Sequence, residues 1–231
     1  MTGLLTPSSR TRIKICEVES LDAAWEIGCL GADALGFHVL NGRDPKGAAE
    51  HFSRIVPHVG TGVESVLLAD IEPGPLRILL GQVRFGTVQL YPDWPPDEID
   101  RLRRDTGVRV LKVVSAVGEE NLVSDHMSFF QLYDGVVDGY LLDSFRRGGT
   151  GQVADWDRCA DLVQGCQLPV FLAGGLTADN VGEAIAKVRP FGVDVESGVS
   201  VRLPTGPWVK SMRRVQRFVD SVDRADRRRA P

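Results

Sequence analysis

The sequence predicts a single-domain α/β protein folded as a closed (β/α)8 barrel, the TIM-barrel architecture. Eight short apolar runs alternate with amphipathic segments, and the centres of the runs recur about every 26 residues from Lys14 to Asp194. This interval accommodates one strand, one helix and two short loops. A doubly wound open sheet usually has fewer strands and often a glycine-rich turn after the first strand. Glu17-Val-Glu19 follows the first run and contains no glycine, so we favour the barrel.

The eight runs are nearly continuous in apolar residues, which is typical of parallel strands buried on both faces. In chain order they cover residues 12–16, 33–38, 63–69, 87–90, 108–114, 139–143, 170–173 and 193–196. Lys14 and Cys16 are two positions apart in the first run. Alternate residues of a strand share a face, so we expect both side chains to point into the barrel.

Helix-starting residues stand between the runs. Caps or first-turn prolines occur at Ser20, Pro45, Pro73, Pro95, Asp155, Thr177 and Pro207. Apolar residues recur at helical spacing over 179–188 and again over 208–222, so we expect helices there. We find no linker and no shift in composition. The predicted organisation is a flexible N-terminal leader (1–11), one barrel domain (12–222) and a basic C-terminal tail (223–231).

Composition narrows the classes of partner. The chain has 231 residues, of which 43% are hydrophobic and 25% charged, as in an ordinary globular protein. No stretch reaches the roughly 18 apolar residues of a membrane span, and the N-terminus lacks the apolar core of a secretory signal. We therefore expect a cytoplasmic protein with no membrane contact. The formal charge is 27 − 31 = −4 with scattered basic residues, which argues against a nucleic-acid partner.

The four cysteines are Cys16, Cys29, Cys159 and Cys166. None forms a C-x-x-C pair, and none has a histidine at metal-ligand spacing. We expect neither a disulfide framework nor a metal site.

Two candidate proton-transfer groups stand at strand ends, where barrel enzymes place their active sites. Asp143 closes an apolar run, and burial there would raise its pKa and suit it to general-acid catalysis. The alternative is an aspartate that caps a helix or stabilises a loop. Cys16 would form a thiolate base if a neighbouring cation lowered its pKa. The alternative is a buried cysteine that serves only as a small apolar residue.

The loops after the seventh and eighth runs carry glycines, at Gly174-Gly175 and at Ser197-Gly198. These two loops form the usual phosphate site of a barrel enzyme, because glycine lets backbone N–H groups approach an anion. The sequence therefore predicts a small phosphorylated substrate.

Seven motifs occur in a family's order and spacing. They are Lys14-Ile-Cys16, Gly31-Ala-Asp-Ala-Leu-Gly-Phe37, Val88-Gln89-Leu90, Leu141-Leu-Asp143, Gly148-Gly-Thr-Gly151 with Asp155-Trp156, Leu172-Ala-Gly-Gly-Leu176 with Asn180-Val181, and Gly192-Val-Asp-Val-Glu-Ser-Gly-Val199. Together they resemble the phosphoribosylanthranilate isomerase family of tryptophan biosynthesis, from about residue 12 to residue 222.

The resemblance implies a barrel isomerase without metal or organic cofactor that catalyses an Amadori rearrangement. By similarity, Asp143 is the general acid and Cys16 the general base. Arg43 would bind the carboxylate of the aglycone through a charge-assisted pair. The remaining substrate-binding residues implied are Lys14, Gln89, Gly174, Gly175, Ser197 and Gly198, the last four around the phosphate.

The chain departs from the family pattern at several positions. Glu17 replaces a common glycine, Tyr91-Pro92 replaces His-Gly, and Ser200 replaces an acidic residue. The family's Gly-x-Lys-Asp pattern reads Gly206-Pro-Trp-Val-Lys210 here, without the aspartate after the lysine. Three functions stay open: the tryptophan-pathway isomerase, a paralogue that rearranges another phosphoribosyl amine, and a catalytically silent barrel that binds a phosphorylated metabolite or a partner protein. The sequence also leaves monomer and homodimer open.

Overall fold

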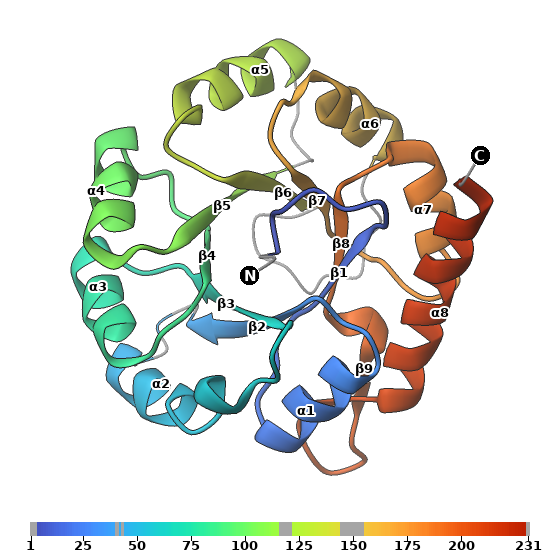
Figure 1. Ribbon diagram of the computed structural model, residues 1–231, viewed down its shortest axis with the longest axis horizontal. Helices are drawn as coiled ribbons and strands as arrows, with labels where there is room; N and C mark the ends of the chain where they lie inside the picture. Colours follow the sequence, from blue (N-terminus) through green and yellow to red (C-terminus); the bar gives the residue numbers. More distant parts are fainter. Residues whose placement is uncertain (1–3, 40–41, 43, 116–121, 144–154, 230–231) are drawn as a thin grey trace.

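The computed structural model contains the closed eight-stranded parallel barrel that the sequence predicts (Figure 1). It describes residues 4–39, 42, 44–115, 122–143 and 155–229, with the backbone alone over 122–127. The strands are β1 (Arg12–Ile15), β2 (Ala34–Val39), β3 (Glu64–Ala69), β4 (Thr87–Leu90), β5 (Arg109–Ser115), β6 (Gly139–Asp143), β7 (Val170–Leu172) and β8 (Gly192–Val195). Each end lies within one residue of its predicted position. The prediction of the barrel is therefore confirmed.

Helices follow the strands and surround the barrel (Figure 1). They are α1 (Leu21–Cys29), α2 (Pro45–Phe52), α3 (Pro73–Gln82), α4 (Pro96–Thr106), α5 (Leu122–Tyr133), α6 (Trp156–Gly165), α7 (Val181–Val188) and α8 (Met212–Arg229), with short 3-10 turns η1 (Val56–His58) and η2 (Ser197–Val199). Side-chain caps begin several of them. Ser20 accepts from the N–H of Ala23, and Asp155 accepts from those of Asp157 and Arg158.

The barrel closes through β1, which pairs with β2 on one side and β8 on the other. Lys14 is in register with Ala34 and with Asp194. Inward-facing apolar side chains form one cluster inside the barrel, and a larger cluster fills the layer between strands and helices. Functional side chains at the ends of β1 and β8 therefore lie side by side although they are far apart in sequence.

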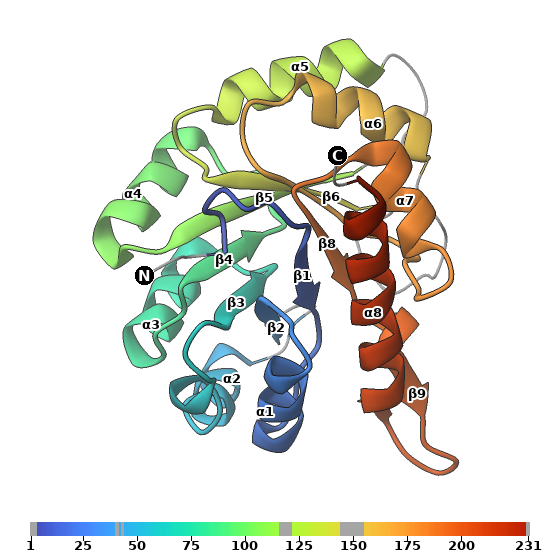
Figure 2. The ribbon, with the colours of Figure 1, turned by 45° about the vertical axis from the view of Figure 1, so that its right-hand side comes forward.

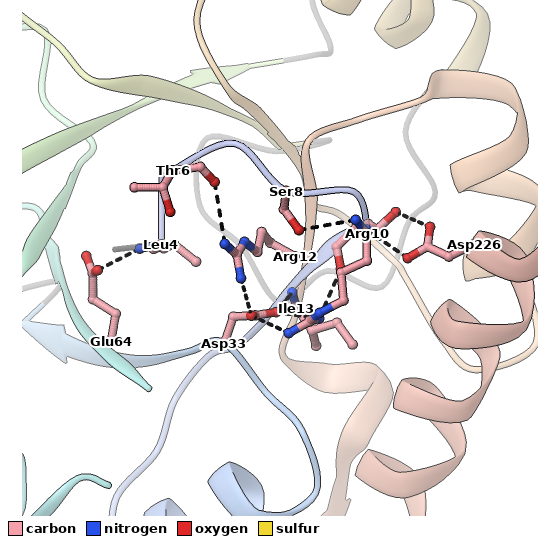
Figure 3. A network of polar contacts seen from close by, with 10 residues as sticks. Leu4, Thr6, Ser8, Arg10, Arg12, Ile13, Asp33, Glu64 and Asp226 are labelled. Atoms are coloured by element: carbon pink, nitrogen blue, oxygen red, sulfur yellow. Dashed lines mark hydrogen bonds and ion pairs between the residues drawn. The ribbon is translucent and has the colours of Figure 1, made fainter. Parts of the chain in front are cut away.

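Residues 4–11, which the sequence analysis assigns to a flexible leader, lie across the end of the barrel where the strands begin (Figures 1 and 3). Leu4 is buried inside the barrel, and its N–H donates to Glu64 at 2.8 Å. Thr11 donates through its N–H and its hydroxyl to Asp226 of α8, each at 2.7 Å. Apolar burial and paired polar groups hold residues 4–11 against the barrel at both ends.

The C-terminal region differs from the prediction of one helix over 208–222. Trp208–Lys210 forms strand β10, which pairs antiparallel with β9 (Ser200–Arg202). The hairpin projects from the end of the barrel where β8 finishes (Figure 2). The helix α8 begins at Met212 and continues to Arg229, so residues 223–229 of the expected tail are helical. The helix prediction was wrong for Trp208–Lys210 because the turn preceding Pro207 returns the chain to β9 before α8 begins.

Among the described residues, no helix is both long enough and apolar enough to cross a membrane. The same residues contain no group of three or more histidine, cysteine or acidic side chains placed to hold a metal ion.

Candidate active site

Four strands deliver polar side chains to the end of the barrel where the strands finish. Lys14 comes from β1, Gln89 from β4, Asp143 from β6 and Asp194 from β8, and all four side chains are buried. Cys16 follows β1 directly and is 2% exposed. Burial of this many polar groups is costly unless they are paired or held for a ligand, so this end of the barrel is the candidate active site.

The Cys16 thiol is held by one cation and one carboxylate. Its Sγ lies 3.1 and 3.2 Å from the two carboxylate oxygens of Asp194, to which the S–H donates. The Lys14 ammonium donates to the same sulfur and forms an ion pair with Asp194 at 3.0 Å. The three groups form a closed triangle, because β1 and β8 pair in register.

The triangle sets the protonation of the thiol. Burial and the Asp194 carboxylate raise the pKa of Cys16 well above its ordinary value, and the Lys14 cation opposes them only in part. The sequence analysis expected a neighbouring cation to lower this pKa. Lys14 acts in that direction, but burial and the carboxylate of a residue 178 positions away, which faces the same sulfur, outweigh it, so the pKa of Cys16 is raised in the free protein. Burial lowers the pKa of Lys14, but Asp194 and Cys16 together raise it above the ordinary value, so Lys14 stays a cation.

Asp143 ends β6 on the far side of the barrel mouth. It is 5% exposed and in register with Ser115 of β5. Its charge and that of Cys16 both contribute, after burial, to raising the pKa of Tyr91, so the three side chains share one space. The raised pKa expected for Asp143 stays a prediction. The glycine-rich Gly148–Gly151 segment and Arg43 lie outside the described residues.

The two loops expected to form a phosphate site meet at the same end of the barrel. Gly174 and Gly175 have φ of 89° and 63°, a left-handed conformation that favours glycine. A Cβ at Gly198 would overlap the carbonyl oxygen of Leu176, so the η2 turn, which includes Ser197, touches the loop after β7 only with glycine there. Asn180 ties this loop together, donating to the carbonyl of Gly175 and accepting from the N–H of Thr177.

A second group of charged side chains borders the Cys16 triangle. Glu196 follows β8, and its Oε2 lies 3.6 Å from His38 Nε2 at the end of β2. Lys210 of the β9–β10 hairpin donates to Ser200 at 2.8 Å and to the carbonyl of Glu196 at 3.3 Å. Its ammonium lies 3.7 Å from the Glu17 carboxylate. We call Glu17, His38, Glu196 and Lys210 the rim cluster.

Burial acts on both signs of charge in the rim cluster. Burial, with smaller contributions from Glu17 and Asp194, raises the pKa of Glu196 to about 7 against the opposing effect of Lys210 and Lys14. Burial also lowers the pKa of Lys210. The charge of Glu196 therefore changes near neutral pH.

Two departures from the family pattern have a structural account. Glu17 has φ 58°, in the left-handed region where glycine is favoured, which explains why a glycine suits this position. With serine at 200, the buried Lys210 takes its carboxylate partner from Glu17 on the β1 side.

The structure brings most of the proposed site residues together. Cys16, Lys14, Gln89, Asp143, Gly174, Gly175, Ser197 and Gly198 all lie at this end of the barrel. The sequence analysis did not assign Asp194, Glu196, His38, Tyr91 or Lys210 to the site. A signal for two of them was present, since Asp194 and Glu196 are polar residues two apart in an apolar strand, the spacing that singled out Lys14 and Cys16.

Comparisons with known proteins agree on one family. Residues 13–221 match the sequence model described as N-(5'phosphoribosyl)anthranilate (PRA) isomerase. The N-(5'-phosphoribosyl)anthranilate isomerase of Methanocella arvoryzae is 34% identical over 217 residues, which are 92% of this chain and 98% of the relative. The enzyme of Methanosarcina acetivorans is 30% identical, over 92% and 93%.

Solved structures give the same result. The phosphoribosyl anthranilate isomerase of Thermus thermophilus has a TM-score of 0.75 and 27% identity, covering 93% of this chain and 99% of its own. A phosphoribosyl anthranilate isomerase solved in complex with reduced 1-(o-carboxyphenylamino)-1-deoxyribulose 5-phosphate has a TM-score of 0.71 and 27% identity, covering 92% and 98%. The likeness spans the whole barrel, including the strand ends that carry the candidate site.

Proposed function

The chain belongs to the N-(5'-phosphoribosyl)anthranilate isomerase family, and we propose that it catalyses the Amadori rearrangement of an N-(5-phosphoribosyl) amine, with phosphoribosylanthranilate of tryptophan biosynthesis as the substrate. One observation carries this proposal: a buried thiol and a buried carboxyl, Cys16 and Asp143, occupy the same end of one barrel. Acid and base are the two groups that this rearrangement needs.

In the proposed mechanism Asp143 acts as the acid. Its carboxyl group donates a proton to the ring oxygen of the ribose, the bond from that oxygen to C1 breaks, and C1 and the nitrogen form an iminium. The Cys16 thiolate then removes the proton from C2, the electron pair of that bond forms a C1=C2 double bond, and the π electrons of the iminium move to the nitrogen and neutralise it. The resulting enol takes a proton at C1 and loses one from its hydroxyl, which gives the 1-amino-1-deoxyketose phosphate.

The Cys16 triangle supports this role for the thiol. In the free protein the S–H faces Asp194, and transfer of its proton to that carboxylate would leave a thiolate beside the Lys14 cation. We propose that bound substrate favours this transfer, because the site then excludes water and brings the iminium close to the sulfur. Lys14 would hold the thiolate in place and contact the substrate.

We assign substrate binding to two further regions. Gly174, Gly175, Ser197 and Gly198 would hold the phosphate, supported by the close contact of their two loops. Arg43 would bind the aglycone carboxylate, and Gln89 the part of the substrate over β4. The bound ligand of the related isomerase, itself a 5-phosphate with a carboxyphenyl group, supports a small phosphorylated ligand here.

A second candidate is the same rearrangement on a different phosphoribosyl amine. The rim cluster favours it, because Glu17 and Glu196 add carboxylates next to the reacting thiol and would attract an aglycone with a hydrogen-bond donor or a positive charge. The silent-barrel alternative has less support, since Cys16 and Asp143 are both in place.

The experiment is a turnover assay that follows the loss of anthranilate-type fluorescence from phosphoribosylanthranilate. Asp143→Asn and Cys16→Ser should each lower turnover by about 10² or more. The matched control is Cys159→Ser, a buried cysteine in α6 outside the site. Full activity in either site variant removes that residue's role. A folded wild-type protein that is inactive on this substrate but active on another amine supports the second candidate, and one inactive on all of them supports the silent barrel.

We also propose that the enzyme works in the cytoplasm, as a biosynthetic isomerase would, and as a monomer or a homodimer, which sedimentation of the purified protein distinguishes.

A further inference from the structure

Tyr91 follows β4 and reaches into the candidate site. It lies two positions after Gln89, so both side chains leave the strand on the same side, toward the barrel interior. The ring of Tyr91 packs against the apolar cluster inside the barrel. Gln89 Nε2 donates to the Tyr91 hydroxyl at 3.0 Å. The two residues therefore form one hydrogen-bonded pair.

The Gln89–Tyr91 pair has hydrogen-bonding capacity left over. Gln89 is 1% exposed, and its Oε1 has no hydrogen-bond partner among the described residues. The Tyr91 hydroxyl accepts from Gln89, so its own hydrogen points elsewhere, and no acceptor for it is found in the described part of the chain. A buried acceptor without a partner is costly, which indicates that a ligand completes the pair.

The pair offers one acceptor and one donor to the same space. If the Gln89 amide is flipped, the Tyr91 hydroxyl donates to Oε1, which leaves Nε2 as the free donor and the Tyr91 oxygen as the free acceptor. The pair therefore presents one free donor and one free acceptor in either orientation of the amide. Burial and the nearby charges of Cys16 and Asp143 raise the pKa of Tyr91 well above its ordinary value, so the phenol keeps its proton.

We propose that Gln89 and Tyr91 together bind a hydroxyl group of the substrate's ribosyl chain, with Tyr91 as a binding residue that the proposed function does not use. An alcohol both donates and accepts hydrogen bonds, as this pair requires. A carboxylate only accepts, a phosphate at neutral pH mainly accepts, and an aromatic ring does neither. The inference rests on the proposed function, because it takes the ligand to be a phosphoribosyl amine.

The test measures binding of reduced 1-(o-carboxyphenylamino)-1-deoxyribulose 5-phosphate by calorimetry, together with analogues that each lack one chain hydroxyl. Tyr91→Phe removes the donor and keeps the ring. We expect it to weaken binding of the parent ligand about tenfold, as for one lost hydrogen bond. Tyr91→His, which keeps a donor, should recover most of the affinity. Tyr140→Phe is the matched control, since the Tyr140 hydroxyl donates to the Phe130 carbonyl outside the site.

The deoxy analogues separate a binding role from a structural one. The analogue that lacks the bound hydroxyl should bind the wild-type protein about tenfold more weakly than the parent ligand does. Tyr91→Phe should bind this analogue as tightly as the wild type does, because the same hydrogen bond is already absent. Equal binding of the parent ligand by wild type and Tyr91→Phe overturns the inference alone, as do additive losses for every analogue. A folded wild-type protein that neither binds the parent ligand nor turns over phosphoribosylanthranilate overturns the proposed function and this inference with it.

Discussion

The Cys16 thiol and the Asp194 carboxylate face each other across the junction of β1 and β8, with Sγ 3.1 Å from Oδ1 and 3.2 Å from Oδ2. The pairing of β1 with β8 brings the two side chains together, and their contact sets the state of the proposed base. A thiol that donates to a carboxylate stays protonated, so the free enzyme holds its base in an inactive form.

The first prediction is that Asp194→Asn lowers the pKa of Cys16, because the variant removes a negative charge that disfavours the thiolate. Ultraviolet absorbance of the thiolate, titrated against pH and corrected with Cys16→Ser, measures the change. Glu196→Gln should lower the pKa less, since Glu196 contributes less than Asp194, and Lys14→Met should raise it. An unchanged titration in Asp194→Asn would show that the carboxylate does not control the thiol.

The second prediction concerns the pH dependence of substrate binding. Burial raises the pKa of Glu196 to about 7, so the carboxyl group becomes charged as pH rises through neutrality. Glu196 precedes Ser197 of the proposed phosphate site, and its charge would repel the phosphate. We expect KM to rise between pH 6 and 8, by roughly threefold to tenfold, and to rise less in Glu196→Gln. Glu26→Gln, at an exposed position of α1, is the control. The same pH profile in all three proteins would exclude this role.

The barrel could be predicted from the sequence because each strand is a separate apolar run. The local residue pattern is enough to recognise each run. Strand ends were predicted to within one residue for the same reason. The β9–β10 hairpin was missed because Trp208-Val-Lys210 precedes an amphipathic helix without a break, and only its pairing with Ser200–Arg202 distinguishes it.

The site was readable only in part. Strand position identified Cys16 and Asp143, but the state of Cys16 depends on Asp194, which β1–β8 pairing brings to it from the other end of the chain. The rim cluster likewise joins residues at or just after the ends of β1, β2 and β8 with one residue of a hairpin. No pattern within one segment of the sequence predicts that His38 and Glu196 lie close together, so their proximity could be seen only in the folded structure.

The third prediction concerns the network at the opposite end of the barrel (Figure 3). The buried Asp33 carboxylate accepts from Arg10 at 2.6 Å, from Arg12 at 2.8 Å and from the N–H of Ile13 at 2.8 Å. Asp33→Ala leaves these donors without their partner and should lower the free energy of unfolding by about 2–3 kcal/mol, measured in urea. Arg217→Ala, which breaks an exposed ion pair with Asp179, should cost less than about 1 kcal/mol. Equal costs in the two variants would contradict the proposed importance of Asp33.

The last prediction follows from Lys112, a fully buried lysine in the layer between β5 and α5. Its ammonium donates to the carbonyls of Tyr91 and Val113, each at 3.1 Å, and lies 2.9 Å from Asp93. It also lies 5.5 Å from the ring centre of Phe129. These contacts hold the loop after β4, which carries Tyr91. Burial nevertheless lowers the pKa of Lys112 to about 7.

The sign of the pH effect follows from that lowered pKa. Between about pH 7 and the ordinary lysine value of 10.5, the unfolded chain binds the proton and the folded protein does not, so the contribution of Lys112 to stability rises with pH across this window. Below pH 7 the folded protein bears the cost of a buried charge. Lys112→Met removes that dependence. We measure the free energy of unfolding of the variant minus that of the wild type at each pH. This difference should be more favourable to the variant at pH 6 than at pH 10, by roughly 3–5 kcal/mol. Lys46→Met, at an exposed position of α2, should follow the wild-type curve. If the two variants have parallel curves, Lys112 is charged throughout and its partners fully offset the burial.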